Sequence, residues 1–76
     1  MNSYYYSFGQ SHSHRVAGVT LDKDSIVEIQ AKDMDAARAK MFEVFGRLWS
    51  MQYDESSLDL KWFPRGIVMV LRADSP

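Results

Sequence analysis

Residues 33–46 read DMDAARAKMFEVFG, and this stretch decides the fold. Apolar side chains recur in it at helical spacing as far as Met41 and Phe45, while most charged residues fall elsewhere around the helix. Asp33 is suited to cap the first turn, and Gly46 is suited to end the last one. We therefore expect a helix from about Asp33 to Phe45 that buries Met41 and Phe45 against a sheet.

The chain on either side of this helix predicts strands. Before the helix, residues 4–8 and 26–31 are rich in strand-forming side chains that alternate between two faces. After it, residues 48–53 alternate again, and residues 66–71 form a β-branched run that is typical of a well-buried strand. The predicted order is strand, strand, helix, strand, strand (ββαββ).

These elements predict one domain of the α+β class, covering residues 1–76, because the chain is too short for a second domain. One helix cannot cover both faces of a four-stranded sheet, so we expect a two-layer sandwich with one open sheet face. Trp49, Met51 and Tyr53 are expected to share one face of their strand. The open face should be lined by some of the aromatic residues Tyr4, Tyr5, Tyr6, Tyr53 and Trp62.

Two stretches are predicted to be connections. Residues 9–18 combine glycine, serine and histidine, although Val16, Val19 and Leu21 could add edge pairing that shortens the loop. Residues 54–61 are mostly polar and suit a short helical turn or an irregular loop. Three apolar side chains are expected to hold this second connection to the core: Leu58, Leu60 and Trp62.

Composition and charge exclude several classes of protein. Nine basic and ten acidic side chains give a net charge of −1, which argues against a protein that holds nucleic acid by charge alone. The chain has no cysteine, so disulfides, thiolate zinc sites and cysteine nucleophiles are excluded, as suits a reducing compartment. The longest apolar stretch, Ile67–Leu71, is too short to cross a bilayer, and the first ten residues lack a signal-peptide pattern. We expect a cytoplasmic protein without a membrane partner.

The candidates for metal binding and catalysis are weak. His12 and His14 lie two residues apart, and Asp22 or Asp24 could add a carboxylate, but no third histidine or cysteine completes a tetrahedral set. Ser11 could in principle serve as a nucleophile, yet no strand, sharp turn and helix positions it. The glycines are too dispersed for a phosphate-binding loop. We therefore predict no metal, no cofactor and no enzymatic activity.

Acidic residues gather in two stretches of the chain. Residues 22–35 hold five acids and two bases, and residues 54–59 hold three acids and no base. Solvated charged faces are the simpler explanation, and docking on a basic protein groove is the functional one. The candidate residues for binding a partner are Asp22, Asp24, Asp33, Asp35, Asp54, Glu55 and Asp59.

A wider pattern of residues resembles a known group of proteins. It comprises Phe8-Gly9-Gln10 with His12, Ala37-Arg38, Met41-Phe42, Phe45-Gly46, Trp49, Tyr53 and Phe63-Pro64-Arg65-Gly66. The pattern resembles small phage and prophage proteins, and among these the chain looks most like the anti-CRISPR inhibitors. The resemblance implies a stoichiometric inhibitor that occupies the surface of a CRISPR–Cas protein or complex in the cytoplasm of a bacterial host. It would act as a monomer or a small homo-oligomer.

Two functions from different classes remain open at the level of sequence. The first is the phage-derived anti-CRISPR inhibitor, which acts by protein contact through the acidic residues and without direct nucleic-acid binding. The alternative is a small nucleic-acid-binding regulator of phage origin with a stacking and phosphate-binding face made by Tyr4, Tyr6, Lys61, Trp62 and Arg65. A second possible contact set consists of the polar and basic residues Gln10, His12, Lys61 and Arg65, which could equally tie loops to the backbone.

Overall fold

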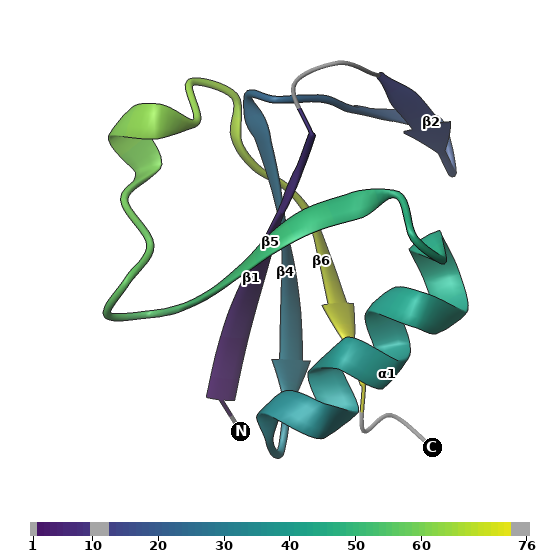
Figure 1. The fold of residues 1–76 in the computed structure, drawn as a ribbon, viewed down its shortest axis with the longest axis vertical. Helices are drawn as coiled ribbons and strands as arrows, with labels where there is room; N and C mark the ends of the chain where they lie inside the picture. Colours follow the sequence, from purple (N-terminus) through teal and green to yellow (C-terminus); the bar gives the residue numbers. More distant parts are fainter. Residues whose placement is uncertain (1, 10–12, 74–76) are drawn as a thin grey trace.

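A computed structural model of the chain describes residues 2–9 and 13–73 and has an α+β fold (Figure 1). The elements are β1 (Asn2–Phe8), β2 (His14–Val16), β3 (Val19–Leu21), β4 (Ser25–Ala31), α1 (Met34–Phe45), β5 (Trp49–Asp54), the 3-10 turn η1 (Leu60–Trp62) and β6 (Gly66–Arg72). The α+β class and one main helix in the described part of the chain are therefore as predicted. The predicted order ββαββ is incomplete, because a hairpin of β2 and β3 lies between β1 and β4. β2 lies in the predicted connection 9–18, and Val16 pairs with Val19, which is the edge pairing that the sequence left open.

Four strands form one mixed sheet in the order β5-β1-β4-β6, and β2 and β3 form a separate two-stranded sheet. β1 runs antiparallel to both of its neighbours, so that Tyr5 lies opposite Glu28 of β4 on one side and Tyr53 of β5 on the other. β4 and β6 are parallel, with Ser25 opposite Gly66. β5 and β6 are consequently the two edges of the sheet.

The burial of β6 differs from its prediction. Its β-branched run is typical of a strand covered on both faces, but its place at the sheet edge leaves Ile67 39% and Val70 52% exposed. Met69 and Leu71 point to the other face and pack against the core. Only one face of β6 is therefore covered, and the prediction of a well-buried strand is wrong.

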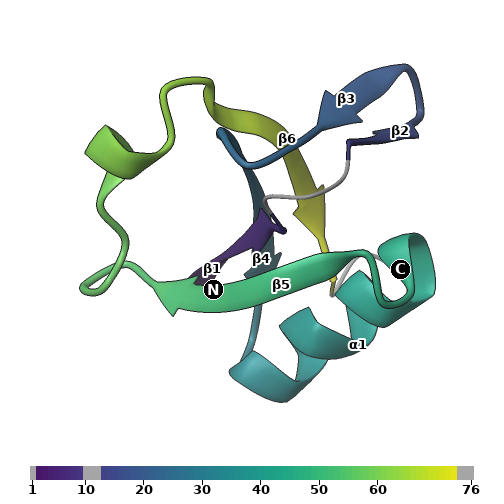
Figure 2. The same ribbon diagram turned by 45° about the horizontal axis from the view of Figure 1, so that its top comes forward.

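Helix α1 connects the end of β4 to the start of β5 and lies against one face of the sheet (Figures 1 and 2). Asp33 caps it as predicted, because a side-chain oxygen of Asp33 accepts a hydrogen bond of 2.8 Å from the amide of Ala36. Gly46 ends it with a φ of 58°, a conformation that favours glycine. Met41 and Phe45 are buried beneath the helix, as the sequence predicts.

The hydrophobic core lies between α1 and the sheet face that carries alternate residues of β1 and β4. Tyr6 and Phe8 are buried there beside Val27 and Ile29, because successive strand residues point to opposite faces. Of the aromatic residues expected on the open face, Tyr5 and Tyr53 lie there opposite one another, whereas Tyr6 is 0% exposed on the covered face. The alternation itself is as predicted, but the position of the helix decides which face is covered.

A β-bulge in β5 changes the side to which Trp49 points. Met51 lies opposite Ser7, yet Trp49 lies opposite Phe8, so Ser50 is skipped in the ladder. Trp49 therefore joins the helix side, where its ring is 5.1 Å from that of Tyr6. The prediction that Trp49 shares a face with Met51 and Tyr53 is wrong for this reason.

The segment between β5 and β6 loops out on the side of the molecule away from α1 (Figure 2). Leu60 and Trp62 of η1 are 45% and 70% exposed, so they do not hold the segment to the core as predicted. Phe63 makes the contact instead, with its ring 6.0 Å from that of Tyr53. The open sheet face is thus partly covered near Tyr53.

Truncation of Phe45 should remove a large part of the core. Phe45 is 3% exposed and its ring lies 5.7 Å from that of Phe8. We expect Phe45→Ala to lower the free energy of unfolding by about 3–5 kcal/mol, which approaches the whole stability of a domain of this size. Urea or thermal unfolding followed by circular dichroism measures the loss. A cooperative transition close to that of the wild type would show that the core is misplaced.

Two buried polar atoms in this core have no hydrogen-bond partner among the described residues, the hydroxyl of Tyr6 and Nε1 of Trp49. Burial raises the pKa of Tyr6 to about 12, so the hydroxyl stays protonated. A buried polar group without a partner is destabilising, because it loses its hydrogen bonds to water and gains none in return.

Removal of the Tyr6 hydroxyl should consequently be harmless. We expect Tyr6→Phe to leave the free energy of unfolding unchanged or to raise it by up to about 1 kcal/mol. Chemical denaturation measures the difference, with Phe8→Ala as a reference that loses core volume. A clear loss of stability in Tyr6→Phe would mean that an ordered water or another group satisfies the hydroxyl.

Candidate functional site

The seven acidic residues predicted to bind a partner do not form one surface. Two of them lie before the start of β4, one lies beside η1, and four lie near the end of β4, the start of α1 and the end of β5. Among the described residues, the carboxylates of Asp22 and Asp59 are paired with cations, whereas those of Asp24 and of the last four residues are not. This difference decides which group is available to a partner.

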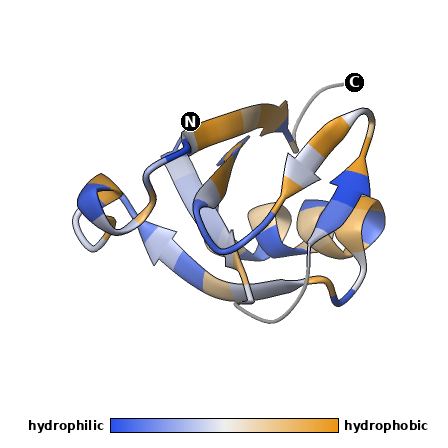
Figure 3. Ribbon diagram, turned by 90° about the horizontal axis from the view of Figure 1, so that it is seen from above, coloured by the Kyte–Doolittle hydropathy of each residue, from blue (hydrophilic) through white to orange (hydrophobic). Residues whose placement is uncertain are grey.

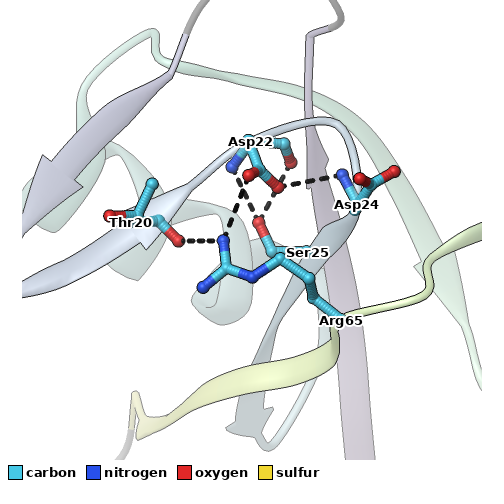
Figure 4. Close-up of polar contacts among 5 residues, drawn as sticks. All are labelled: Thr20, Asp22, Asp24, Ser25 and Arg65. Carbon is cyan, nitrogen blue, oxygen red and sulfur yellow. Dashed lines mark hydrogen bonds and ion pairs between the residues drawn. The ribbon is translucent and has the colours of Figure 1, made fainter.

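Asp22 and Asp24 belong to a network that fastens the β2–β3 hairpin to the start of β6 (Figure 4). Nη1 of Arg65 donates to the backbone oxygen of Thr20 at 2.7 Å and to Oδ2 of Asp22 at 3.2 Å. The other carboxylate oxygen of Asp22 accepts from the amide of Asp24 at 3.0 Å, and the Asp24 carbonyl accepts from the amide of Arg65 at 2.9 Å. The Asp22 carboxylate is therefore engaged inside the molecule.

Asp59 has a similar structural role. Its Oδ1 accepts a hydrogen bond of 3.1 Å from the amide of Lys61 and so caps η1. Its Oδ2 lies 3.5 Å from Nζ of Lys61, so an exposed ion pair offsets part of its charge. Asp59 therefore contributes little to any acidic surface.

The remaining four acids gather at the opposite end of the sheet from Asp22. Asp33 and Asp35 flank Met34 at the start of α1, and Asp54 and Glu55 follow one another where β5 ends. We call these four residues the acidic end. Within the described ranges, none of their carboxylates takes part in an ion pair, whereas Asp22, Glu43 and Asp59 do.

A groove of about 480 Å³ lies at the acidic end. Asp54 and Glu55 line one part of it and Met34 lines another, and the remaining lining residues are Asn2, Ser3, Tyr4 and Ser56. Met34 is 45% exposed, so an apolar surface and two carboxylates face the same space. The groove can thus accept a side chain with an aliphatic stem and a cationic head.

Hydrogen bonds in the turn after β5 favour the ionised form of Asp54. Its Oδ1 accepts hydrogen bonds from the Ser56 hydroxyl at 2.8 Å and from the Ser57 amide at 2.9 Å. These hydrogen bonds from Ser56 and Ser57 lower the pKa of Asp54, because they stabilise the ionised carboxylate. Asp54 therefore shapes the turn after β5 and also supplies fixed charge to the groove.

Glu28 is an acidic residue of this region that the sequence does not single out. It lies on the open face of β4, half-buried, and its Oε2 accepts from the Ser3 hydroxyl at 3.2 Å and from Nε2 of Gln30 at 3.1 Å. Burial, and then the charge of Glu28, raise the pKa of Tyr5. The strand alternation places Glu28 on a face, but only the register with β1 brings it to Ser3, which also lines the groove.

The stacking face proposed from the sequence for nucleic acid is not assembled. Tyr6 is buried under α1, Tyr4 packs against the same core, and the Arg65 guanidinium is held by Thr20 and Asp22. Trp62 is exposed, with Nζ of Lys61 5.3 Å from its ring. The other two residues of the second contact set, Gln10 and His12, lie outside the described residues.

Some other types of site are absent from the described ranges 2–9 and 13–73. They contain no group of three histidine, aspartate or glutamate side chains placed to hold a metal ion, and no helix long and apolar enough to cross a membrane. No protein-family model, curated protein or solved structure matches the chain. The case for its function therefore depends on the chemistry of its own surface.

The pKa of Asp54 provides a direct check on the geometry of the acidic end. We expect NMR titration to show a value below that of an ordinary aspartate, and Ser56→Ala to raise it by removing a hydrogen bond to the carboxylate. Because the folded-state pKa is lowered, Asp54 stabilises the fold above its unfolded pKa, and this contribution is lost as the pH falls through the lowered value. Ser50→Ala should leave the pKa unchanged, and an ordinary pKa in the wild type would contradict the hydrogen bonds.

Proposed function

We propose that this chain is a non-enzymatic inhibitor that binds a protein partner stoichiometrically through its acidic end. The observation that carries the proposal is the groove of about 480 Å³ beside Asp54 and Glu55, whose carboxylates have no cationic partner in the described part of the chain. Unpaired carboxylates around a groove favour a partner that presents lysine or arginine. The acidic end is therefore the surface that should meet the partner.

The groove suits a basic side chain better than a free cation. The aliphatic stem of a lysine or arginine would lie against Met34 and Tyr4, while its charged head would reach Asp54 and Glu55. Asp33 and Asp35 add negative charge beside Met34, and charge of one sign over a wider area speeds association with an oppositely charged surface. Such binding weakens as salt concentration rises, because the exposed charges are screened.

The resemblance to phage and prophage proteins suggests which partner to test first. Anti-CRISPR inhibitors of this kind occupy surfaces of CRISPR–Cas complexes, often where DNA or a partner subunit would dock. A surface that binds the phosphates of DNA is rich in lysine and arginine. An acidic end that competes for such a surface would inhibit without any chemical step, so a CRISPR–Cas effector complex is the proposed partner.

The alternative, a regulator that binds nucleic acid, has weaker support. Lys61 and the exposed Trp62 remain available for stacking, but Lys61 is paired with Asp59 and Arg65 with Asp22. With a net charge of −1 and an unpaired acidic end, the surface would repel a phosphate backbone over much of its area. The test below therefore includes nucleic-acid binding as the result that would support the alternative.

Charge reversal at the acidic end should weaken inhibition without unfolding the chain. We expect the double variant Asp35→Lys with Glu55→Lys to weaken binding to a CRISPR surveillance complex by about tenfold or more. Both side chains are exposed and in no ion pair with a described residue, so each substitution should cost at most about 1 kcal/mol, the larger part at Asp35, which lies in the first turn of α1. Titration of the protein into the complex, with target-DNA binding as the readout, measures inhibition and its stoichiometry.

A matched control makes the same change of charge elsewhere on the surface. The double variant Asp24→Lys with Glu43→Lys should inhibit as the wild type does, because both residues lie outside the acidic end. Equal weakening by both double variants would show that net charge rather than this surface matters. If the wild type inhibits no such complex and instead binds single-stranded DNA at physiological salt, the nucleic-acid function is correct.

A further inference from the structure

Both edges of the four-stranded sheet are available for pairing in the described part of the chain, where β5 pairs only with β1 and β6 only with β4. An open strand edge can hydrogen-bond to a strand of another chain unless charge, proline or local irregularity prevents it. Neither edge strand contains proline. Each has one residue without a partner on the neighbouring strand, Ser50 in β5 and Val68 in β6. The charges at the ends of each strand therefore decide which partner each edge accepts.

The charges around β5 are complementary to those of a second, antiparallel copy. Arg47 lies two residues before the strand, and Asp54 ends it. In the ladder with β1 the chain skips Ser50. When two copies of β5 pair antiparallel about a two-fold axis at Met51, the turn that carries Arg47 in either copy comes beside the end of β5 that carries Asp54 in the other.

In this register, side chains on the open face of one copy meet side chains on the open face of the other. Met51 and Tyr53 point to the open face, since they lie opposite Ser7 and Tyr5 of β1. Tyr53 of one copy would meet Leu48 of the other, and the two Met51 side chains would meet at the axis. Met51 is 54% exposed and Leu48 is 38% exposed in the single chain, so pairing would bury apolar surface that is now open to water.

The Arg47 side chain is available for such a contact. It is exposed and takes part in no ion pair with any described residue. Asp54 is exposed as well, and its hydrogen bonds to Ser56 and Ser57 use only Oδ1. Its other carboxylate oxygen can therefore accept a guanidinium from a second copy.

The other edge has no complementary charges for such a contact. β6 lies between two basic residues, Arg65 and Arg72, and its ladder with β4 skips Val68. The Arg65 guanidinium is already bound to the Thr20 carbonyl oxygen and the Asp22 carboxylate. β6 is the more apolar edge, and it lies on the opposite side of the molecule from β5 (Figure 3).

We infer that two copies of this chain associate through antiparallel pairing of their β5 edges, which joins their two sheets into one continuous sheet. The interface is isologous, because the same strand serves both copies. It requires no other partner, so it goes beyond the proposed function. It engages Asp54 and leaves Asp35 and Glu55 of each copy at the acidic end.

Sedimentation velocity on the purified full chain, over a range of concentrations, tests this inference without any partner protein. We expect a concentration-dependent dimer for the wild type and a monomer for Met51→Lys, which places two ammonium groups at the two-fold axis. The matched control is Val70→Lys, an equally exposed position on the open face of β6, which should keep the dimer. Circular dichroism confirms that both variants remain folded.

The charge contact is tested separately. Arg47→Glu should raise the dimer dissociation constant by about tenfold, since two attractive pairs become repulsive. Mixing Arg47→Glu with Asp54→Arg should restore association, because a heterodimer of the two variants has opposite charges at both contacts. A wild type that stays monomeric at every concentration would overturn the inference. So would a dimer that survives Met51→Lys or dissociates with Val70→Lys.

Discussion

The packing of α1 against the sheet face that carries Tyr6 and Phe8 is the constraint on which the rest of the structure depends. It buries Met41 and Phe45 on one side and leaves the opposite face of the sheet to be covered only by the segment that leads to β6. The helix also connects two parallel strands that lie on either side of β1, and β5 lies at the edge of the sheet. The open face is therefore a consequence of having a single helix on this sheet.

Much of this fold is predictable from local pattern, and the errors come from contacts between distant residues. The cap at Asp33, the end at Gly46 and the buried Phe45 follow from spacing and residue type. The side to which Trp49 points does not, because a bulge at Ser50 changes the alternation, and bulges depend on how a strand pairs. The exposure of Val70 likewise depends on the position of β6 in the sheet, which its own residues do not determine.

The candidate surface was only partly predictable, because an acidic residue has the same appearance in sequence whether it caps a turn or faces a partner. Asp22 and Asp59 each have a basic residue nearby in the fold, and neither is available as free negative charge. The sequence neighbours of Asp22 give no hint of Arg65, which meets it through the start of β6. Glu28 could not be identified from the sequence, because only its neighbours on the adjacent strand bring it toward the groove.

The parallel pairing of β4 with β6 has a consequence for how the chain folds. β1 and β4 are joined through a small hairpin and can pair early, and α1 then follows directly. The helix, β5 and η1 lie between β4 and β6 in the sequence, so the contacts of β6 with β4 join residues that are far apart along the chain. Contacts of this kind slow folding, because a long loop must close before they form. Until that step, the edge of β4 is open, and an open strand edge in an incompletely folded chain favours pairing with strands of other chains.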